Sequence, residues 1–210
     1  MHKDGKNEKE KDQEIKVILI GESGTGKTSL INSVIGQQFI EGSQISSMMC
    51  SLVKLTLNIE GKDYEIDLWD TIGQEKFRSL TKIFLNDSKI VIFVFDITDL
   101  NSFNELEFWF DTIDKELGSD PIRAIAANKQ DLENIKVNED QIKEYANKKK
   151  VLCSYTSAYN GEAFKSFLIK LLKIYLEKNK NKKQGDSGGD DNKIKKLNKR
   201  TKSIKKKKKC

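Results

Sequence analysis

The chain has 210 residues, and its 38 lysines and arginines outnumber its 32 aspartates and glutamates to give a net charge of +6. This length suits one folded domain with polar ends, which excludes a second enzyme domain. The sequence has no secretory leader and no apolar run near the roughly 20 residues that span a bilayer, so we expect a cytosolic protein. Its cysteines, Cys50, Cys153 and Cys210, have no spacing typical of disulfides or metal sites, and we interpret Cys153 as a small buried apolar residue.

The first predicted element is a strand over the apolar residues 15–20, and a helix is predicted over residues 28–35. The segment between them, from Gly21 to Thr28, fits the phosphate-gripping P-loop pattern. Its glycines let the backbone N–H groups converge on nucleotide phosphates, while Lys27 reaches the β and γ groups and Thr28 offers its hydroxyl to Mg²⁺. The candidate phosphate-binding residues of this segment are Gly21, Ser23, Gly24, Thr25, Gly26, Lys27 and Thr28.

The next two elements form a predicted antiparallel hairpin, because the strand-like runs 52–59 and 64–69 flank the turn residues Glu60 and Gly61. The second run delivers Asp70 beside the magnesium, where it would act through a water molecule. It also brings the N–H of Gly73 to the γ-phosphate. Gln74 then lies where it can orient the attacking water, so we interpret it as the candidate catalytic residue.

Three further strands are predicted over residues 90–95, 122–127 and 151–155, and helix-length segments separate them. Strands joined in this way lie parallel and have helices on both faces of the sheet. The fold class is therefore α/β, with three layers and a six-stranded, mostly parallel sheet that has one antiparallel strand. The last helix has one apolar stripe that we expect to pack on the sheet, with an interaction helix as the alternative: Ala163, Phe164, Phe167, Leu168, Leu171, Leu172, Tyr175 and Leu176.

A base-binding loop is predicted after the strand over residues 122–127, where the chain reads Asn-Lys-Gln-Asp from Asn128 to Asp131. The carboxyl ends of strands are where open α/β sheets bind ligands. Asp131 can accept hydrogen bonds from the two N–H donors of guanine, a pattern that adenine cannot offer. We expect Asn128 to tie this loop to the P-loop, and the stem of Lys129 to cover the base.

These motifs together resemble those of the small GTPases of the Ras superfamily, and most closely the Rab branch. The resemblance is carried by the P-loop, by Trp-Asp-Thr-Ile-Gly-Gln-Glu from Trp69, by Asn128 to Asp131 and by Thr-Ser-Ala ending at Ala158, and it covers residues 15–177. It implies a P-loop G domain that binds GTP and GDP with Mg²⁺. It also implies a monomeric molecular switch in vesicle and membrane traffic that works with an exchange factor, a GTPase-activating protein and effectors.

The resemblance also implies site residues that the motifs alone do not give. Ser157 and Ala158 would contact the guanine, and Phe39 would pack against its edge, with a plain apolar loop anchor as the alternative. A serine replaces the threonine that the family uses as its other magnesium ligand, which makes the metal set Thr28, Ser47 and Asp70. The family's spacing counted back from Trp69 selects Ser47. The same spacing counted forward from Lys27 would select Ser46 instead. Leu52, Trp69 and Phe84 match an apolar partner patch of Rabs, although their pattern alone favours the core.

Several departures from the family bear on turnover. Ile72 replaces an alanine, Tyr159 replaces a lysine, and methionines stand at Met48 and Met49 in the segment that usually specifies effectors. Residues 36–52 hold no arginine or lysine, so we expect slow hydrolysis that needs an activating protein. One alternative is a GTP-binding interaction module with little hydrolysis. A P-loop ATPase is another alternative, which the Asn128 to Asp131 segment opposes.

The ends of the chain differ from its middle. We expect a disordered polar segment over residues 1–14, a G domain over residues 15–177, and a flexible basic tail over residues 178–210 with a net charge of +12. Lipidation of Cys210 beside Lys205 to Lys209 would make a two-signal anchor for an anionic membrane. Cys210 opens no C-a-a-X box and lacks a second cysteine. A solvated extension, nuclear import and nonspecific nucleic-acid contact are the alternatives, and we expect no specific nucleic acid as partner.

Overall fold

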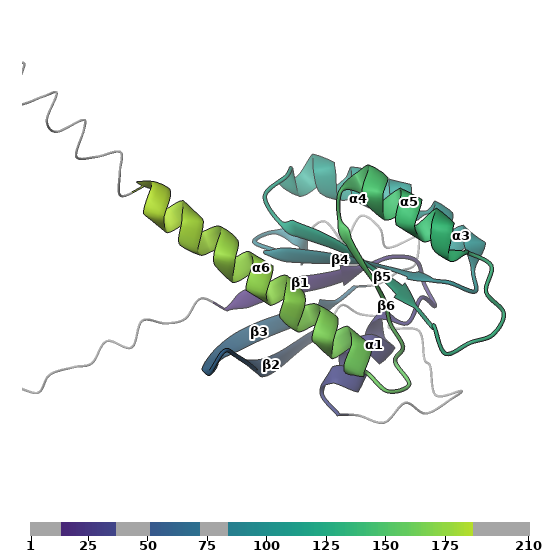
Figure 1. Cartoon of the computed structure of the whole chain (residues 1–210), viewed down its shortest axis with the longest axis horizontal. Coiled ribbons are helices and arrows are strands. Elements are labelled where there is room, and N and C mark those ends of the chain that lie inside the picture. Colours follow the sequence, from purple (N-terminus) through teal and green to yellow (C-terminus); the bar gives the residue numbers. More distant parts are fainter. Residues whose placement is uncertain (1–13, 37–50, 72–83, 187–210) are drawn as a thin grey trace, which may run out of the picture. The chain divides into compact units, whose positions relative to one another are not determined.

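The computed structural model describes residues 14–36, 51–71 and 84–186 of the chain (Figure 1). The chain divides into two compact units, Met1–Leu171 and Leu172–Cys210. The site described below belongs to the first unit. The helices and strands, in chain order, are β1 (Ile15–Ile20), α1 (Lys27–Val34), β2 (Ser51–Ile59), β3 (Lys62–Asp70), β4 (Ile90–Asp96), α3 (Leu100–Asn104), α4 (Leu106–Leu117), β5 (Ile122–Asn128), α5 (Glu139–Lys149), β6 (Leu152–Tyr155) and α6 (Glu162–Asp186).

The six strands form one sheet in the order β2-β3-β1-β4-β5-β6. Only the β2–β3 pair is antiparallel, and every other neighbouring pair is parallel. Glu60 and Gly61 form the turn between β2 and β3 with φ of 55° and 82°, a left-handed pair that matches the right-handed twist of the strands. The predicted fold class is confirmed, and each predicted strand begins and ends within two residues of the observed one.

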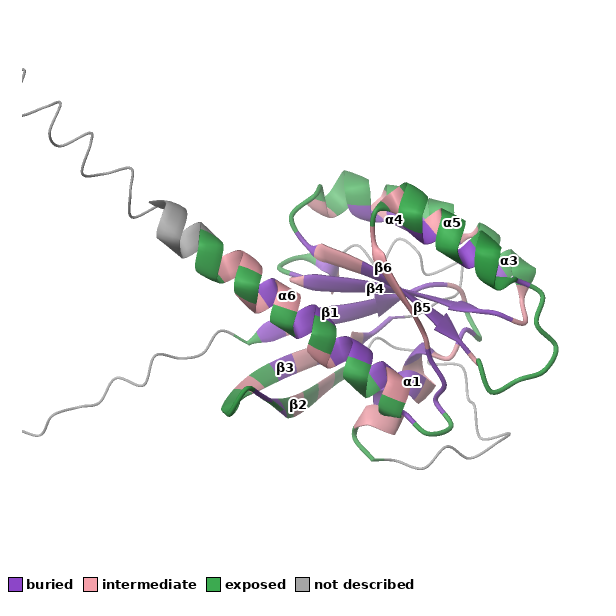
Figure 2. Cartoon of the chain, in the orientation of Figure 1, coloured by how far each residue is buried: buried purple, intermediate pink, exposed green. Residues whose placement is uncertain are grey.

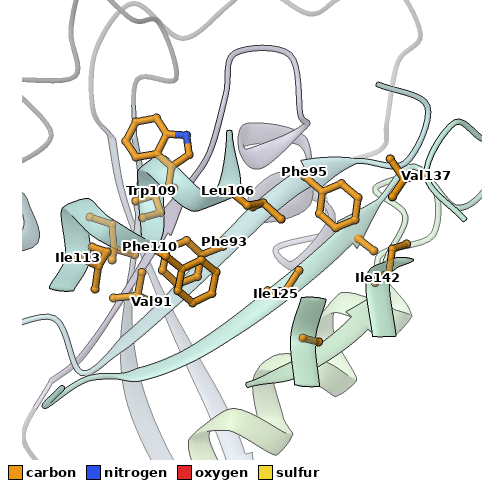
Figure 3. Close-up of a cluster of buried hydrophobic side chains, with 14 of the residues drawn as sticks. Val91, Phe93, Phe95, Leu106, Trp109, Phe110, Ile113, Ile125, Val137 and Ile142 are labelled. Carbon is orange, nitrogen blue, oxygen red and sulfur yellow. The ribbon is translucent and has the colours of Figure 1, made fainter. Parts of the chain in front are cut away.

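The core lies on both faces of the sheet because its central strands are apolar throughout. All seven residues of β4 are buried (Figure 2). One face carries a cluster in which the rings of Phe93 and Phe110 stack with centroids 3.8 Å apart, and Ile125 and Ile142 join it from β5 and α5 (Figure 3). Because side chains alternate along a strand, the intervening residues of β1 and β4 point to the opposite face. Helix α1 contacts β3 on that opposite face, so helices cover both faces of the sheet (Figure 1).

The last helix carries the predicted apolar stripe. Phe164, Phe167, Leu168 and Leu171 are buried in the first unit, which favours core packing over the interaction-helix alternative for this part of α6. The helix continues to Asp186, beyond residue 177 where the sequence predicts the folded part to end. The domain bounds themselves stay a prediction. Among the described residues, no helix combines the length and the apolar character needed to cross a membrane.

Cys153, which the sequence predicts to be a small buried apolar residue, lies in β6 and is partly buried. Burial raises the pKa of its thiol from 9.0 to about 11, opposed by a hydrogen bond with the backbone of Ala127. The side chain therefore behaves as a small apolar group with an unreactive thiol at neutral pH. Cys50 and Cys210 lie outside the described residues.

Candidate functional site

The P-loop leaves the carboxyl end of β1, the strand that lies between β3 and β4 in the sheet. Gly21 has φ of 145°, and a Cβ at this position would collide with the backbone carbonyl oxygen of Val94 in β4. Gly26 has φ of 91°, and a Cβ there would collide with the side-chain amide of Asn128. Both positions therefore need glycine for two reasons, the left-handed backbone and the close approach of a neighbouring element.

Helix α1 begins at Lys27, directly after the loop, and its first turn is open to an anion. Gly26 is the N-cap residue, and no side chain caps the helix. No acidic residue stands in the first turn of α1. The first N–H groups of a helix lack intrahelical partners and carry the positive end of the helix dipole. This arrangement fits the phosphates of a nucleotide.

Lys27 is a buried cation, with only 5% of its surface exposed. Its Nζ donates hydrogen bonds to the carbonyl oxygens of Gly21, at 2.9 Å, and of Glu22, at 2.8 Å. Burial lowers the pKa of Lys27 to about 8, although the charges of Asp70 and Glu22 act in the opposite direction. A buried ammonium group that is held by carbonyl dipoles is well suited to an anionic ligand, since a phosphate would restore the charge balance.

The two predicted metal ligands of the described chain lie in contact. Thr28 Oγ1 donates a hydrogen bond to Asp70 Oδ2 at 2.5 Å, and Asp70, at the end of β3, is 1% exposed. The next residue, Thr71, donates from its hydroxyl to the carbonyl oxygen of Leu19 at 2.7 Å, which fixes the end of β3 against β1. Hydroxyl and carboxylate oxygens are the hard ligands that Mg²⁺ prefers, so this donor pair fits the metal.

Asn128 connects the P-loop to two other loops and is 1% exposed. Its Nδ2 donates to the carbonyl oxygen of Thr25 at 2.8 Å, and its Oδ1 accepts a hydrogen bond from Thr156 Oγ1 at 3.1 Å. The N–H of Gln130 donates to the carbonyl oxygen of Thr156 at 3.1 Å. The loops after β1, β5 and β6 are therefore tied together at the carboxyl edge of the sheet by one buried carboxamide.

The remaining predicted base-binding residues surround this junction. Lys129 adopts a left-handed backbone with φ of 66°, and its Nζ lies 2.6 Å from Asp96 Oδ2. Asp131 is exposed on the loop after β5. Ser157 and Ala158 are buried in the loop after β6, where Ser157 Oγ accepts a hydrogen bond from the N–H of Tyr159 at 3.0 Å.

Known proteins resemble this chain over most of its length. The family model described as Ras family matches residues 16–177. The chain belongs to the Ras family. It is 35% identical over 165 residues to the Ras-related protein Rab-21 of Geodia cydonium, which covers 78% of this chain and 72% of the relative.

Two further relatives place the chain in the Rab branch of the Ras family. It is 31% identical over 189 residues to the Ras-related protein SEC4 of Saccharomyces cerevisiae, covering 90% of this chain and 87% of the relative. It is 34% identical over 163 residues to the Ras-related protein Rab-21 of Homo sapiens, covering 77% of this chain and 72% of the relative. The chain is thus a Rab-like small GTPase that binds GTP and GDP. The alternative of an interaction module without hydrolysis is not favoured.

Several residues that the Ras-family resemblance brings to the site lie outside the described residues. These are Phe39, Ser46, Ser47, Ile72, Gly73, Gln74 and Cys210. Their roles stay predictions, as do those of Met48 and Met49. The other sequence-predicted site residues are all described, and the structure brings the P-loop, Asp70 and the loop from Asn128 together at one edge of the sheet.

The Rab-like partner patch is partly exposed. Leu52 is 41% exposed and is the register partner of Trp69 across the β2–β3 pair. The rings of Trp69 and Phe84 lie 5.8 Å apart, and both are half-buried. The pattern of the three residues alone favours the core, and Trp69 and Phe84 do pack against the core cluster, whereas Leu52 is exposed.

Three residues near the site were not singled out as site residues from the sequence. Thr156 orients Asn128, and the sequence signal that indicates it is the Thr-Ser-Ala segment, which begins at Thr156. Trp109 Nε1 donates to Glu22 Oε1 of the P-loop at 3.1 Å, and no pattern in the sequence indicates this contact. Asp96 pairs with Lys129 across two strands, which no local pattern could show.

Proposed function

We propose that the P-loop, Asp70 and the loops after β5 and β6 form the single pocket in which this Rab-like GTPase holds a guanosine phosphate. The observation that carries the proposal is the Asn128 carboxamide, because it bonds both to Thr25 in the P-loop and to Thr156 beside Ser157. A phosphate site and a base site that are tied by one buried side chain can be filled by one nucleotide. Asp131 would then accept from guanine, and the Lys129 stem would cover the ring.

The phosphate half of the pocket uses the features of α1 and the P-loop. The N–H groups of Gly21, Ser23, Gly24, Thr25 and Gly26 would surround the phosphates, with the buried Lys27 ammonium as their counter-charge. Lys27 already lies inside the loop on the carbonyl oxygens of Gly21 and Glu22. It needs only to exchange those two acceptors for phosphate oxygens.

The magnesium half uses Thr28, Ser47 and Asp70. Mg²⁺ supplies neutralisation of the charge on the β- and γ-phosphate oxygens. Thr28 would bind it directly through Oγ1, and Asp70 would act through a water molecule, consistent with the 2.5 Å hydrogen bond between the two side chains. Asp70 is well placed to hold such a water because its carboxylate is buried at the end of β3.

Hydrolysis is assigned to Gln74, which would orient the attacking water, while the Gly73 N–H meets the γ-phosphate. The segment 36–52 has no basic residue, so no arginine from it can stabilise the transition state. Turnover should therefore be slow until an activating protein supplies a cation, as in Ras, where a partner arginine raises the rate about 10⁵-fold. An exchange factor would reload the protein with GTP, and effectors would bind the triphosphate state.

The cellular role that suits these properties is a monomeric switch in vesicle and membrane traffic. The C-terminal lysines, with lipidation of Cys210, would attach the protein to the cytosolic face of an anionic membrane. Mass spectrometry of the C-terminal peptide from native cells tests this part. A geranylgeranyl mass on Cys210 is expected. An unmodified Cys210 thiol in that peptide would contradict the lipid anchor.

Single-turnover hydrolysis tests the catalytic part. The purified chain is loaded with GTP in the presence of a chelator, Mg²⁺ is added, and GDP is measured by chromatography. We expect Mg²⁺-dependent conversion that Gln74→Leu slows, while Gln141→Leu in the exposed capping box of α5 leaves it unchanged. Equal rates for the parent and Gln74→Leu, with and without activating protein, would show that Gln74 has been assigned wrongly.

A further inference from the structure

An ion pair crosses from β4 to β5 at the edge of the sheet where the pocket lies. Asp96 is the last residue of β4 and is the register partner of Asn128, the last residue of β5. Lys129 follows Asn128, and its Nζ lies 2.6 Å from Asp96 Oδ2. Of the two side chains, Asp96 is 9% exposed and Lys129 is 27% exposed, so the carboxylate is almost fully buried.

The carboxylate of Asp96 is held on its second oxygen as well. Oδ1 accepts hydrogen bonds from the N–H of Thr98, at 2.8 Å, and from Thr98 Oγ1, at 2.7 Å. The backbone N–H of Asp96 donates to Ser102 Oγ at 3.0 Å, which anchors the end of β4 to α3. Because both oxygens have partners, the carboxylate cannot rotate without losing a hydrogen bond. Asp96 is therefore a fixed anion rather than a mobile surface charge.

Lys129 is fixed at its backbone and at its charged end. Its φ of 66° is uncommon for a residue with a side chain. Hydrogen bonds on both sides hold that conformation: the Asn128 carbonyl oxygen before it accepts from Ile97 N–H at 3.1 Å, and Gln130 N–H after it donates to the Thr156 carbonyl oxygen at 3.1 Å. With the ammonium group on Asp96, the apolar stem between these two anchors has lost most of its rotamer freedom before any ligand binds.

We propose that Asp96 is a positioning residue for the guanine nucleotide, because it holds the Lys129 stem in the place where the stem covers the base. This inference rests on the proposed function, in which Lys129 lies against guanine. A stem that is already ordered does not have to be ordered by the nucleotide, which lowers the cost of binding. Loss of Asp96 therefore shortens the lifetime of bound nucleotide while the chemistry at the γ-phosphate stays unchanged.

The test is the dissociation rate of fluorescent GDP from the full-length chain in excess unlabelled GDP and Mg²⁺. Asp96→Asn, which keeps the shape and one acceptor oxygen, is expected to raise the rate about tenfold, the factor of one lost hydrogen bond between charged groups. Asp114→Asn is the matched control. It breaks the ion pair of Asp114 with Arg123, also at 2.6 Å, at an exposed place on α4 and is expected to leave the rate unchanged.

A double-mutant cycle separates positioning from a merely structural role. Lys129→Met and the double variant Asp96→Asn/Lys129→Met are measured in the same way. If Asp96 acts through Lys129, the double variant dissociates no faster than Lys129→Met alone, because the two effects are not additive. Additive effects, or single-turnover GTP hydrolysis slowed by Asp96→Asn at saturating nucleotide, would overturn the inference.

The cycle also separates this inference from the proposed function. A Lys129→Ala variant, which removes the apolar stem as well as the ammonium group, would contradict the role of Lys129 in the pocket itself if it released GDP at the parent rate. Faster release from Lys129→Met with an unchanged Asp96→Asn would overturn the inference alone. If Asp96→Asn does not fold, Thr98→Val serves instead, since it removes the hydroxyl that fixes Asp96 Oδ1 and is expected to raise the rate about threefold.

Discussion

The Asn128 side chain and the Thr25 carbonyl oxygen are joined by a buried hydrogen bond of 2.8 Å, although 103 residues separate them in the sequence. These two residues lie on the loops after β1 and β5, and the two strands are not neighbours because β4 lies between them in the sheet. Asn128 bridges this gap, and the glycine at Gly26 is what lets the P-loop approach it. The proposed phosphate and base parts of the pocket would thereby be held at a fixed separation.

Asn128→Ala is expected to raise the dissociation rate of GDP by about one to two orders of magnitude. The change leaves the Thr25 carbonyl oxygen and the Thr156 hydroxyl without this partner, and a buried polar group that loses its partner costs about 1–3 kcal/mol. Fluorescent GDP release measures the effect. Asn138→Ala is the control, because it removes an exposed helix cap of α5, costs about 1 kcal/mol of stability and should not alter release.

Gly26→Ala is expected to abolish tight nucleotide binding. A methyl group at this position would collide with the Asn128 amide as well as face a left-handed backbone. Gly61→Ala is the matched comparison, since Gly61 has φ of 82° but open space around its Cβ position. Nucleotide content after purification, read by chromatography, should fall only for Gly26→Ala. Equal nucleotide content in both variants would mean that the contact with Asn128 is unimportant.

Cys153 is expected to react slowly with iodoacetamide in the folded chain. Burial raises the pKa of its thiol to about 11, so at pH 8 the thiolate is roughly a hundredfold scarcer than for an ordinary thiol. The folded state binds this proton more tightly than the unfolded state. The resulting stability is fully present below pH 9 and is lost as the pH rises from 9 to 11. Peptide mass mapping of native and denatured samples measures the rates, and equal rates would contradict the burial.

The sheet could be predicted from sequence because each strand has its own apolar run between turn signals. The run from Ile90 and the run from Ile122 are both buried strands, and the left-handed turn at Glu60 and Gly61 follows from its residue types. The end of α6 was not found, because its charged residues after position 177 resemble the composition of a tail. The helix propensity of the lysines in residues 178–183 lets such a segment continue a helix without an apolar face.

The candidate site could be predicted where its chemistry is local in the sequence. The P-loop is one such place, and the tie from Asn128 to it was also expected and is observed. Partners that meet only in the fold were not predicted, namely Trp109 with Glu22 and Asp96 with Lys129. Each of these contacts depends on which strands are neighbours, and strand order is not encoded in any short segment.

Titration calorimetry of the folded, nucleotide-free chain with GDP in the presence of Mg²⁺ measures whether the pocket holds a guanine nucleotide, with ATP and xanthosine diphosphate as comparison ligands. We expect one tight site for GDP and no measurable heat with ATP. In Asp131→Asn we expect a change of preference to xanthosine diphosphate, because the carboxylate that would accept from guanine is gone. A folded parent chain that gives no heat with GDP, or an Asp131→Asn variant with unchanged preference, would contradict the proposed guanine pocket.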